Sequence, residues 1–101
     1  CTVESSSIII CAPGESVLLP CRDINSPHAH VQWWYSDSKI LTPQYSVVPV
    51  DTIKGQRYKD RVKIHGNNSL SITRLTVDDT GMYWCKTTET DTNRNVQLGI
   101  E

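Results

Sequence analysis

The stretch Asp79-Thr80-Gly81-Met82-Tyr83-Trp84-Cys85 decides the fold of this chain when it is read with Cys21, 64 residues upstream of Cys85. Side chains alternate between the two faces of a strand, so Tyr83 and Cys85 share one face. Cys21 closes the apolar face of a strand-like stretch, 16–21, in the same way. Both cysteines are therefore predicted to point inward and to form a disulfide, which would close a loop of about 65 residues worth roughly 4 kcal/mol.

The two other cysteines, Cys1 and Cys11, complete an even count in a short chain, and no spacing matches a zinc-binding C-x-x-C pattern. We therefore predict disulfides and an oxidising compartment, outside the cell or in the secretory lumen. A straight strand would hold Cys1 about 30 Å from Cys11. A hairpin turning at residues 5–7 would set Val3 against Ile9 and bring the two cysteines together. The alternative is a bond from either cysteine to another chain.

Composition favours strands over helices. Val, Ile and Leu make up about a quarter of the 101 residues, and Ser and Thr are common while Ala is rare. Turn signals recur at short intervals, and alternating strand-length pieces lie between them, among them 31–35, 70–72 and 96–100. We predict a single all-β domain over residues 1–101, a sandwich or a barrel, with no helix beyond one turn near 76–79.

Charge and hydropathy exclude several classes of function. The net charge of −1 disfavours nucleic acid and anionic membrane surfaces as partners. The longest apolar run, residues 8–12, is too short to span a membrane, and no signal peptide is present, so targeting segments are expected outside these 101 residues. His28 and His30 are interpreted as solvated loop residues. With no Ser-His-Asp order, no nucleophile elbow and no metal-ligand set, we predict no enzyme, no cofactor, no metal and no small-molecule substrate.

The order of motifs resembles a variable-type immunoglobulin domain. Cys21, Val31-Gln32-Trp33, Leu70-Ser71-Ile72 with Leu75, and 79–85 match its strands B, C, E and F over nearly the whole chain. The resemblance implies an all-β, immunoglobulin-like sandwich of two antiparallel sheets. It also implies that residues 39–56 hold the extra C′ and C″ strands of the variable type.

The resemblance assigns four scaffold residues. Trp33 is expected to be the core ring that packs on the Cys21–Cys85 bridge, and Tyr83 to be the tyrosine corner whose hydroxyl bonds to backbone. Arg61 is expected to pair with Asp79 at one end of the sandwich. The basic run containing Arg61 (Lys54, Arg57, Lys59, Arg61 and Lys63) is otherwise interpreted as a solvated edge strand.

An aromatic pair is the sharpest candidate for a binding site. If Trp33 and Tyr83 face inward, period-two alternation turns Trp34 and Trp84 outward on neighbouring strands. Exposed aromatic patches of this kind mark contact surfaces. The predicted interface consists of Gln32, Trp34, Trp84, Lys86 and Gln97. The alternative is that both tryptophans lie beneath the C′ segment and the loop before the last strand, partly covered by Ile40 or Leu41.

The resemblance implies a second candidate site in three tip loops, 24–29, about 49–55 and 87–94, at the positions of the complementarity-determining loops. The predicted ligand contacts are Ser26, His28, His30, Thr88, Glu89, Asp91, Asn93 and Arg94. The last loop lacks the aromatic residues and glycine of a typical paratope. The aromatic-Gly-x-Gly bulge of antibody and T-cell receptor variable domains is also missing from residues 93–99, which disfavours a rearranged receptor.

The remaining resemblance is to single variable-type domains of leukocyte receptors, co-receptors, co-stimulatory ligands and adhesion molecules. It implies an extracellular domain of a plasma-membrane protein that binds a protein ligand on another cell, an antigen-presenting molecule among the candidates. It further implies a homodimer or a heterodimer with a related variable-type domain. The alternative is an adhesion or co-stimulatory module that uses the same sheet face, and a secreted decoy or carbohydrate-binding domain is third. Asn67 begins an N-x-S triplet and is predicted to be glycosylated.

Overall fold

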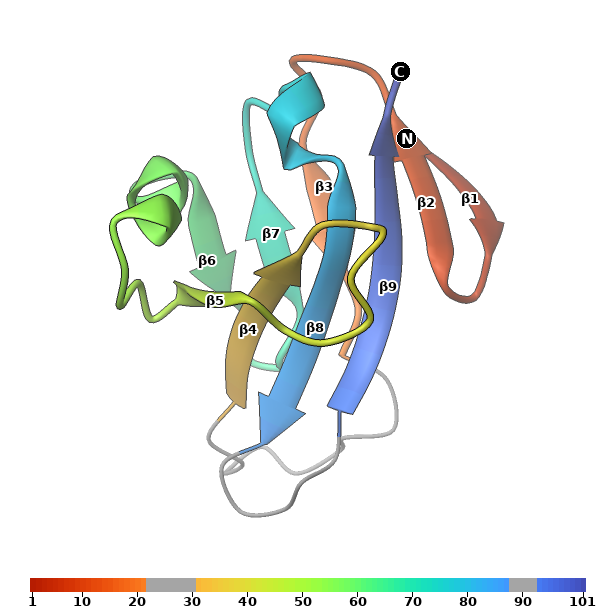
Figure 1. Cartoon of the computed structure of the whole chain (residues 1–101). Helices are drawn as coiled ribbons and strands as arrows, with labels where there is room; N and C mark the ends of the chain where they lie inside the picture. Colours follow the sequence, from red (N-terminus) through yellow and green to blue (C-terminus); the bar gives the residue numbers. More distant parts are fainter. Residues whose placement is uncertain (22–30, 88–92) are drawn as a thin grey trace.

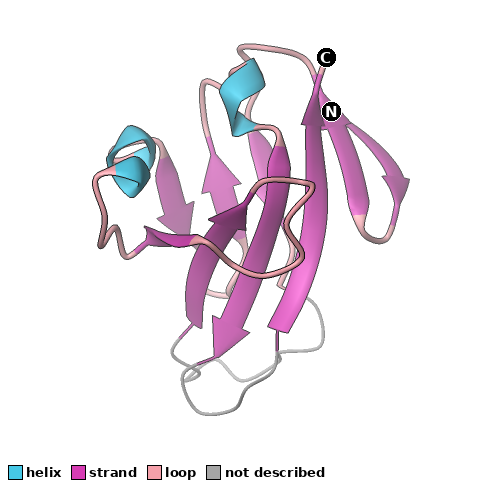
Figure 2. Ribbon diagram, in the orientation of Figure 1, coloured by secondary structure: helices cyan, strands magenta, loops and turns pink. Residues whose placement is uncertain are grey.

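The computed structural model describes residues 1–21, 31–87 and 93–101, which form two packed sheets (Figures 1 and 2). One sheet has six strands in the order β1-β2-β9-β8-β4-β5, and the other has three in the order β3-β7-β6. The strands are β1 (Thr2–Ser5), β2 (Ile8–Cys11), β3 (Val17–Leu19), β4 (Val31–Ser36), β5 (Tyr45–Val48), β6 (Val62–Ile64), β7 (Leu70–Ile72), β8 (Gly81–Thr87) and β9 (Asn93–Ile100); the single 3-10 turns are η1 (Lys54–Tyr58) and η2 (Val77–Asp79). The predicted all-β sandwich is confirmed.

Among the described strands, neighbours run antiparallel with one exception, the parallel pair formed by β2 and β9. The chain reverses after β1, and the returning strand β2 lies beside β9 and runs in the same direction (Figure 1). The predicted antiparallel sheets are therefore confirmed apart from this one pair of strands. Strand alternation says nothing about which edge an N-terminal hairpin will join.

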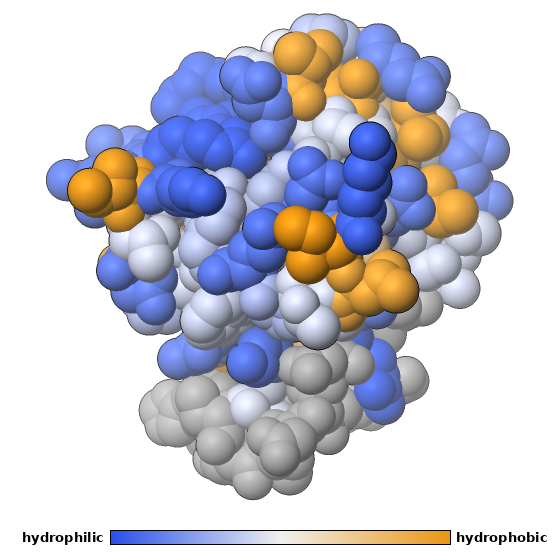
Figure 3. Space-filling view, in the orientation of Figure 1, coloured by the Kyte–Doolittle hydropathy of each residue, from blue (hydrophilic) through white to orange (hydrophobic). Residues whose placement is uncertain are grey.

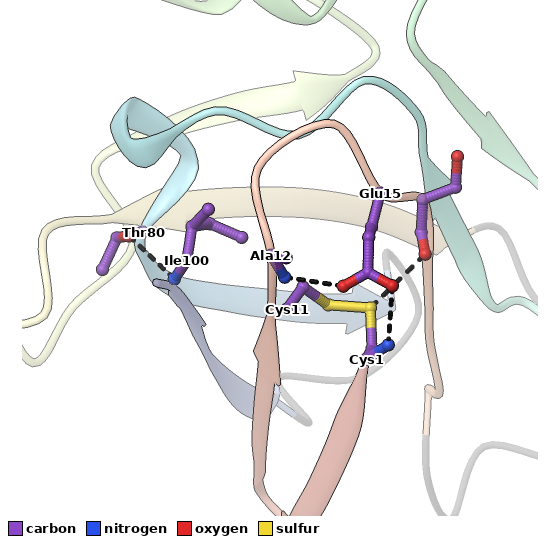
Figure 4. Close-up of a disulfide and its surroundings, with 7 residues drawn as sticks. Cys1, Cys11, Ala12, Glu15, Thr80 and Ile100 are labelled. Atoms are coloured by element: carbon purple, nitrogen blue, oxygen red, sulfur yellow. Dashed lines mark hydrogen bonds and ion pairs between the residues drawn. A yellow bond between two sulfur atoms is a disulfide. The ribbon is translucent and has the colours of Figure 1, made fainter.

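The first disulfide closes that N-terminal hairpin. Val3 lies opposite Ile9, as the hairpin interpretation predicts, and Cys1 is bonded to Cys11 (Figure 4). Beyond Cys11, the Glu15 carboxylate accepts a hydrogen bond of 2.6 Å from the backbone N–H of Ala12, which stabilises the turn that leads to β3. The alternative bond to another chain is not the arrangement in this structure, where all four cysteines are paired within the chain.

The core is built around the second disulfide, Cys21–Cys85. Trp33 lies directly opposite Cys85 across the β4–β8 pair, and its indole N–H donates a 2.9 Å hydrogen bond to the carbonyl of Asn68. The hydroxyl of Tyr83 donates a 2.7 Å hydrogen bond to the backbone carbonyl of Asp79. Both rings are fully buried, so each polar tip has the partner that burial requires.

The segment 39–56 contains one additional strand rather than two. The strand β5 pairs with β4, and after an isolated bridge between Val47 and Val50 the chain leaves the sheet and enters η1. The predicted C″ strand is therefore wrong for this chain. Pro49 offers no N–H to a ladder, and the helical turn buries Tyr58, which an edge strand would not achieve.

A buried ionic network closes one end of the sandwich. The carboxylate of Asp79 is fully buried and accepts two hydrogen bonds from the guanidinium of Arg61, at 3.0 and 2.9 Å. Arg57 donates a further hydrogen bond to Asp79 and another to the hydroxyl of Tyr58, and its guanidinium lies 4.2 Å from the centre of the Tyr58 ring. Arg57 was predicted to be solvated, which is wrong, because η1 turns its side chain inward.

The pKa of Asp79 links this network to pH. Burial raises the pKa, but the hydrogen bonds from Arg61 and from the backbone N–H of Thr76, with the charges of Arg61 and Arg57, outweigh it and hold the pKa below its usual value. A carboxyl with a lowered folded pKa contributes stability above its unfolded pKa of about 4, and this contribution is lost as the pH falls through the folded pKa.

We therefore expect the free energy of unfolding to decrease when the pH falls below about 4, and to decrease less steeply in an Asp79→Asn variant, whose side chain does not titrate. Urea denaturation at a series of pH values measures both slopes. Parallel curves for the two proteins would show that Asp79 does not carry the acid sensitivity.

Candidate protein-binding face

The outer face of the six-stranded sheet carries a row of side chains across three strands. Trp34 on β4 lies opposite Trp84 on β8, and Trp84 lies opposite Asn95 on β9. Two residues away along each strand, Gln32 lies opposite Lys86. Because Trp33 and Cys85 occupy the core, alternation places all of these residues on the outer face, and all but Asn95 belong to the predicted interface.

Trp84 does not form an exposed anchor, because only 8% of its surface is exposed. Its indole N–H donates a 2.9 Å hydrogen bond to the hydroxyl of Ser36, which donates in turn to the carbonyl of Ile40 at 3.1 Å. The connection between β4 and β5 crosses in front of β8 at this point (Figure 1). The expectation that Trp84 is exposed is thus wrong, and the alternative in which the C′ segment covers it is the arrangement observed.

Trp34 remains half-exposed and is held in place by two polar neighbours. Its indole N–H donates a 3.2 Å hydrogen bond to the side-chain carbonyl of Gln32, and the ammonium of Lys86 lies 4.8 Å from the centre of its ring. A cation at this distance is attracted to the face of an indole. The ring is therefore fixed before any partner binds, which reduces the ordering cost of binding.

The segment that covers Trp84 presents its own apolar side chains to solvent. Leu41 is 75% exposed, and Ile40 is exposed to a smaller extent. The segment is well ordered by its own hydrogen bonds: Asp37 N–H donates to the side-chain carbonyl of Gln44 at 2.7 Å, and Gln44 N–H donates to the carbonyl of Tyr35. The exposed or partly exposed apolar side chains on this face are Ile40, Leu41 and Trp34, which we call the sheet-face patch.

The surface view shows how limited the apolar areas are. On the face shown, hydrophobic atoms form several separate areas within a mostly polar surface (Figure 3). One of these areas lies in the middle of this face, where the β4–β5 connection crosses the sheet.

The remaining predicted site residues are distributed unevenly. Gln97 is exposed and lies opposite Met82, which is two residues before Trp84 on β8. The residue opposite Trp84 is Asn95. Sequence reasoning missed Asn95, although the same period of two that selected Gln97 also selects it. Asn93 and Arg94 were predicted to be loop residues, but both lie in β9, because that strand begins earlier than the turn signals indicate.

Most of the tip-loop prediction lies outside the described residues. This applies to Ser26, His28, His30, Thr88, Glu89 and Asp91. Of the second loop, 49–55, Ile53 is the most exposed apolar side chain. Within residues 1–21, 31–87 and 93–101, no three metal-binding side chains lie together, and no helix is long and apolar enough to cross a membrane.

Comparison with protein families matches residues 9–97 to the model described as immunoglobulin domain. This chain belongs to the immunoglobulin domain family. The match covers the Cys21–Cys85 bridge, Trp33 and the tyrosine corner, which are the features that organise the core described above.

Two curated relatives match this immunoglobulin domain over about four fifths of its length. Basigin of Mus musculus is 35% identical over 92 residues, which cover 81% of this chain and 21% of basigin. Cell surface A33 antigen of Mus musculus is 33% identical over 99 residues, which cover 83% of this chain and 30% of that protein. The chain thus spans between a fifth and a third of the length of these relatives.

Solved structures agree with the fold of this immunoglobulin domain. The extracellular domain of the voltage-gated sodium channel beta4 subunit superposes with a TM-score of 0.62 at 21% identity, over 99% of this chain and 89% of that one. Drosophila Semaphorin 2a superposes with a TM-score of 0.68 at 14% identity, over 94% of this chain and 14% of that one. At these identities the likeness concerns the fold alone.

Proposed function

We propose that this immunoglobulin domain is an extracellular recognition module of a cell-surface protein and that it binds a second copy of itself through the sheet-face patch. The observation that carries the proposal is the exposed Leu41, held on an ordered segment above Trp84 and next to Ile40. A partly exposed tryptophan on a rigid support, with exposed aliphatic side chains on the same face, has the properties of a binding hot spot.

The relatives support this proposal. A33 antigen is named as a cell-surface protein, and the beta4 subunit structure is described as a parallel homodimer that explains a role in cell-cell adhesion. The chemistry of the patch agrees: Leu41 and Ile40 supply apolar area, and Gln32 and Lys86 supply a polar rim. An isologous contact of such patches places equivalent residues of two copies against each other.

A charge placed in the centre of the patch is expected to disrupt self-association. We expect Leu41→Asp to weaken the dimer at least tenfold, or about 1.4 kcal/mol, because two carboxylates would meet across the symmetry axis. Sedimentation equilibrium over a wide range of protein concentration measures this change. Trp34→Ser is expected to weaken the dimer as well, because it removes the fixed aromatic ring from the sheet-face patch.

Val77→Ser is the matched control, since Val77 is a similarly exposed aliphatic residue on η2 and lies outside the patch. The control should dimerise like the unmodified chain. Reductant should not be required to separate the dimer, because all four cysteines are paired within the chain and none links two copies. A chain that stays monomeric at every concentration would refute self-recognition through this face.

In a second candidate function, this domain is the variable-type domain of an immune receptor or co-receptor and binds a different protein. The observation that favours it is the regular pairing of β8 and β9 from Gly81–Leu98 to Lys86–Asn93. A germline-encoded receptor domain needs no bulge in its last strand, unlike the rearranged receptors. If this second function is correct, beads coated with this domain would bind to cells that do not carry the domain, and the coated beads would not bind to one another.

A further inference from the structure

A concave surface opens between the β1–β2 hairpin and the three-stranded sheet. Its volume is about 470 Å³, and its walls come from the hairpin, from the end of β3 and from the turn between β6 and β7. We call this surface the hairpin groove. The side chains that matter below are Val3, Ile9, Leu18, Pro20, Asn67 and Ser69.

Part of the groove is lined by apolar side chains of β1 and β3 that no neighbouring strand covers. Val3 is 69% exposed and Leu18 is 54% exposed, although both belong to strands. Within the part of the chain that the structure describes, β1 pairs only with β2, and β3 pairs only with β7. The Cys1–Cys11 disulfide holds β1 against β2 rather than beside β3 (Figure 4). Natural proteins cover or block open strand edges of this kind, because such edges promote aggregation.

Asn67 lines this groove and lies in a turn of fixed geometry. Its side-chain carbonyl accepts a 3.2 Å hydrogen bond from the N–H of Ser69, which leaves the amide nitrogen as the reactive group of an exposed side chain. The next residue, Asn68, adopts a left-handed conformation with φ 69° and is tied to the core by the hydrogen bond from Trp33. The triplet Asn67-Asn68-Ser69 is the only N-x-S or N-x-T pattern in the chain.

We propose that Asn67 carries an N-linked glycan and that its first sugars lie in the hairpin groove, against Val3, Leu18 and Pro20. In the transfer, the amide nitrogen of Asn67 forms a bond to the anomeric carbon of a lipid-pyrophosphate-linked oligosaccharide and loses a proton. The bond from that carbon to the pyrophosphate breaks, and the lipid pyrophosphate leaves.

The chemistry of the first sugar, an N-acetylglucosamine, matches both parts of the groove. Its acetamide methyl and its C–H face suit Leu18 and Val3, and its hydroxyls suit the backbone groups of the open β3 edge. The groove volume lies within the range of sites that hold small ligands. The glycan would thereby cover the edges that the folded-back hairpin leaves open. The proposal rests on the extracellular placement given under the proposed function, because the transfer takes place in the secretory lumen.

The first test measures occupancy of Asn67. The chain is secreted from cultured mammalian cells behind a heterologous signal sequence, and its intact mass is measured before and after treatment with peptide N-glycosidase. We expect one glycan on the unmodified chain and on Ser69→Thr, which keeps the acceptor pattern, and none on Asn67→Gln. An unmodified chain with the mass of the bare polypeptide would overturn the proposal. Because secretion is imposed, this outcome does not depend on the sheet-face patch or on the natural location.

The second test measures whether the sugars lie in the groove. Under native conditions, the rate of glycan removal is expected to increase several-fold in Leu18→Ser and to stay unchanged in Val77→Ser, a similarly exposed aliphatic position on η2. Hydrogen exchange of residues 2–5 and 17–19 is expected to be slower in the glycosylated chain than in Asn67→Gln. Equal removal rates and equal exchange would show that the glycan points into solvent, which overturns the placement.

Discussion

Replacement of Asp79 by alanine is expected to lower the free energy of unfolding by roughly 3–5 kcal/mol, because it leaves the charges of two arginines without their buried partner. Asp79 is fully buried and accepts hydrogen bonds from both Arg61 and Arg57. It also accepts a hydrogen bond from the backbone N–H of Thr76, the N-cap residue of η2. The substitution thus removes an ion pair and a helix cap together.

The two arginines are not expected to contribute equally. Arg61 binds Asp79 through two parallel hydrogen bonds and also donates to the carbonyls of Thr73 and Arg74. Arg57 makes a single bond to the carboxylate and is more exposed. Arg61→Lys is therefore expected to cost more than Arg57→Lys, since an ammonium does not reproduce the bidentate geometry.

Urea denaturation of the single and double variants measures these terms, and the coupling between Asp79 and each arginine follows from double-mutant cycles. Asp78→Ala is the matched control, because Asp78 is the neighbouring acidic residue of η2 and is exposed. Its loss should change the free energy of unfolding by no more than about 0.5 kcal/mol. If Asp79→Ala were as mild as this control, the network would not support the fold.

Removal of the Cys21–Cys85 disulfide is expected to have an effect of similar size. The bond joins residues 64 apart in sequence, and the loop-closure model assigns it about 4 kcal/mol. A small domain has a total stability of about 5–15 kcal/mol, so a double variant with both cysteines replaced by alanine should be close to unfolding at physiological temperature. Thermal denaturation followed by circular dichroism measures the loss.

The Cys1–Cys11 disulfide provides the comparison. It spans 10 residues of a hairpin whose strands are already paired, so the same model assigns it a smaller contribution of about 3 kcal/mol. We expect its removal to loosen β1 while the core stays folded. Hydrogen exchange should become faster in residues 2–5 and stay slow in β4 and β8. Global unfolding of both double variants to the same extent would contradict this division between a local and a central disulfide.

The pairing of the core residues was predictable because it follows from local alternation. Trp33 and Trp34 lie on opposite faces of β4 simply because they are adjacent, and Tyr83 faces the same way as Cys85 because they are two residues apart. The single turn at η2 was also predictable, since a Thr76 cap with an acid three residues later is a local signal.

The candidate site was predictable only in part. Alternation places Trp84 on the outer face, but its burial depends on a segment that returns across the sheet and contributes the carbonyl of Ile40. No periodicity in residues 81–87 contains that information. The same reasoning applies to Arg57, whose inward direction comes from a helical turn at a place where strand alternation predicts an exposed side chain.

By itself, the sequence determined the class of fold, the inward and outward faces of the long strands and the central disulfide, because these depend on residues one or two positions apart and on a few inward cysteines. The tertiary structure alone decided that Leu41 is exposed while Trp84 is buried, that two arginines share Asp79, and that the N-terminal hairpin leaves a groove beside Asn67. These features arise from contacts between distant segments, whose geometry depends on how the whole chain packs.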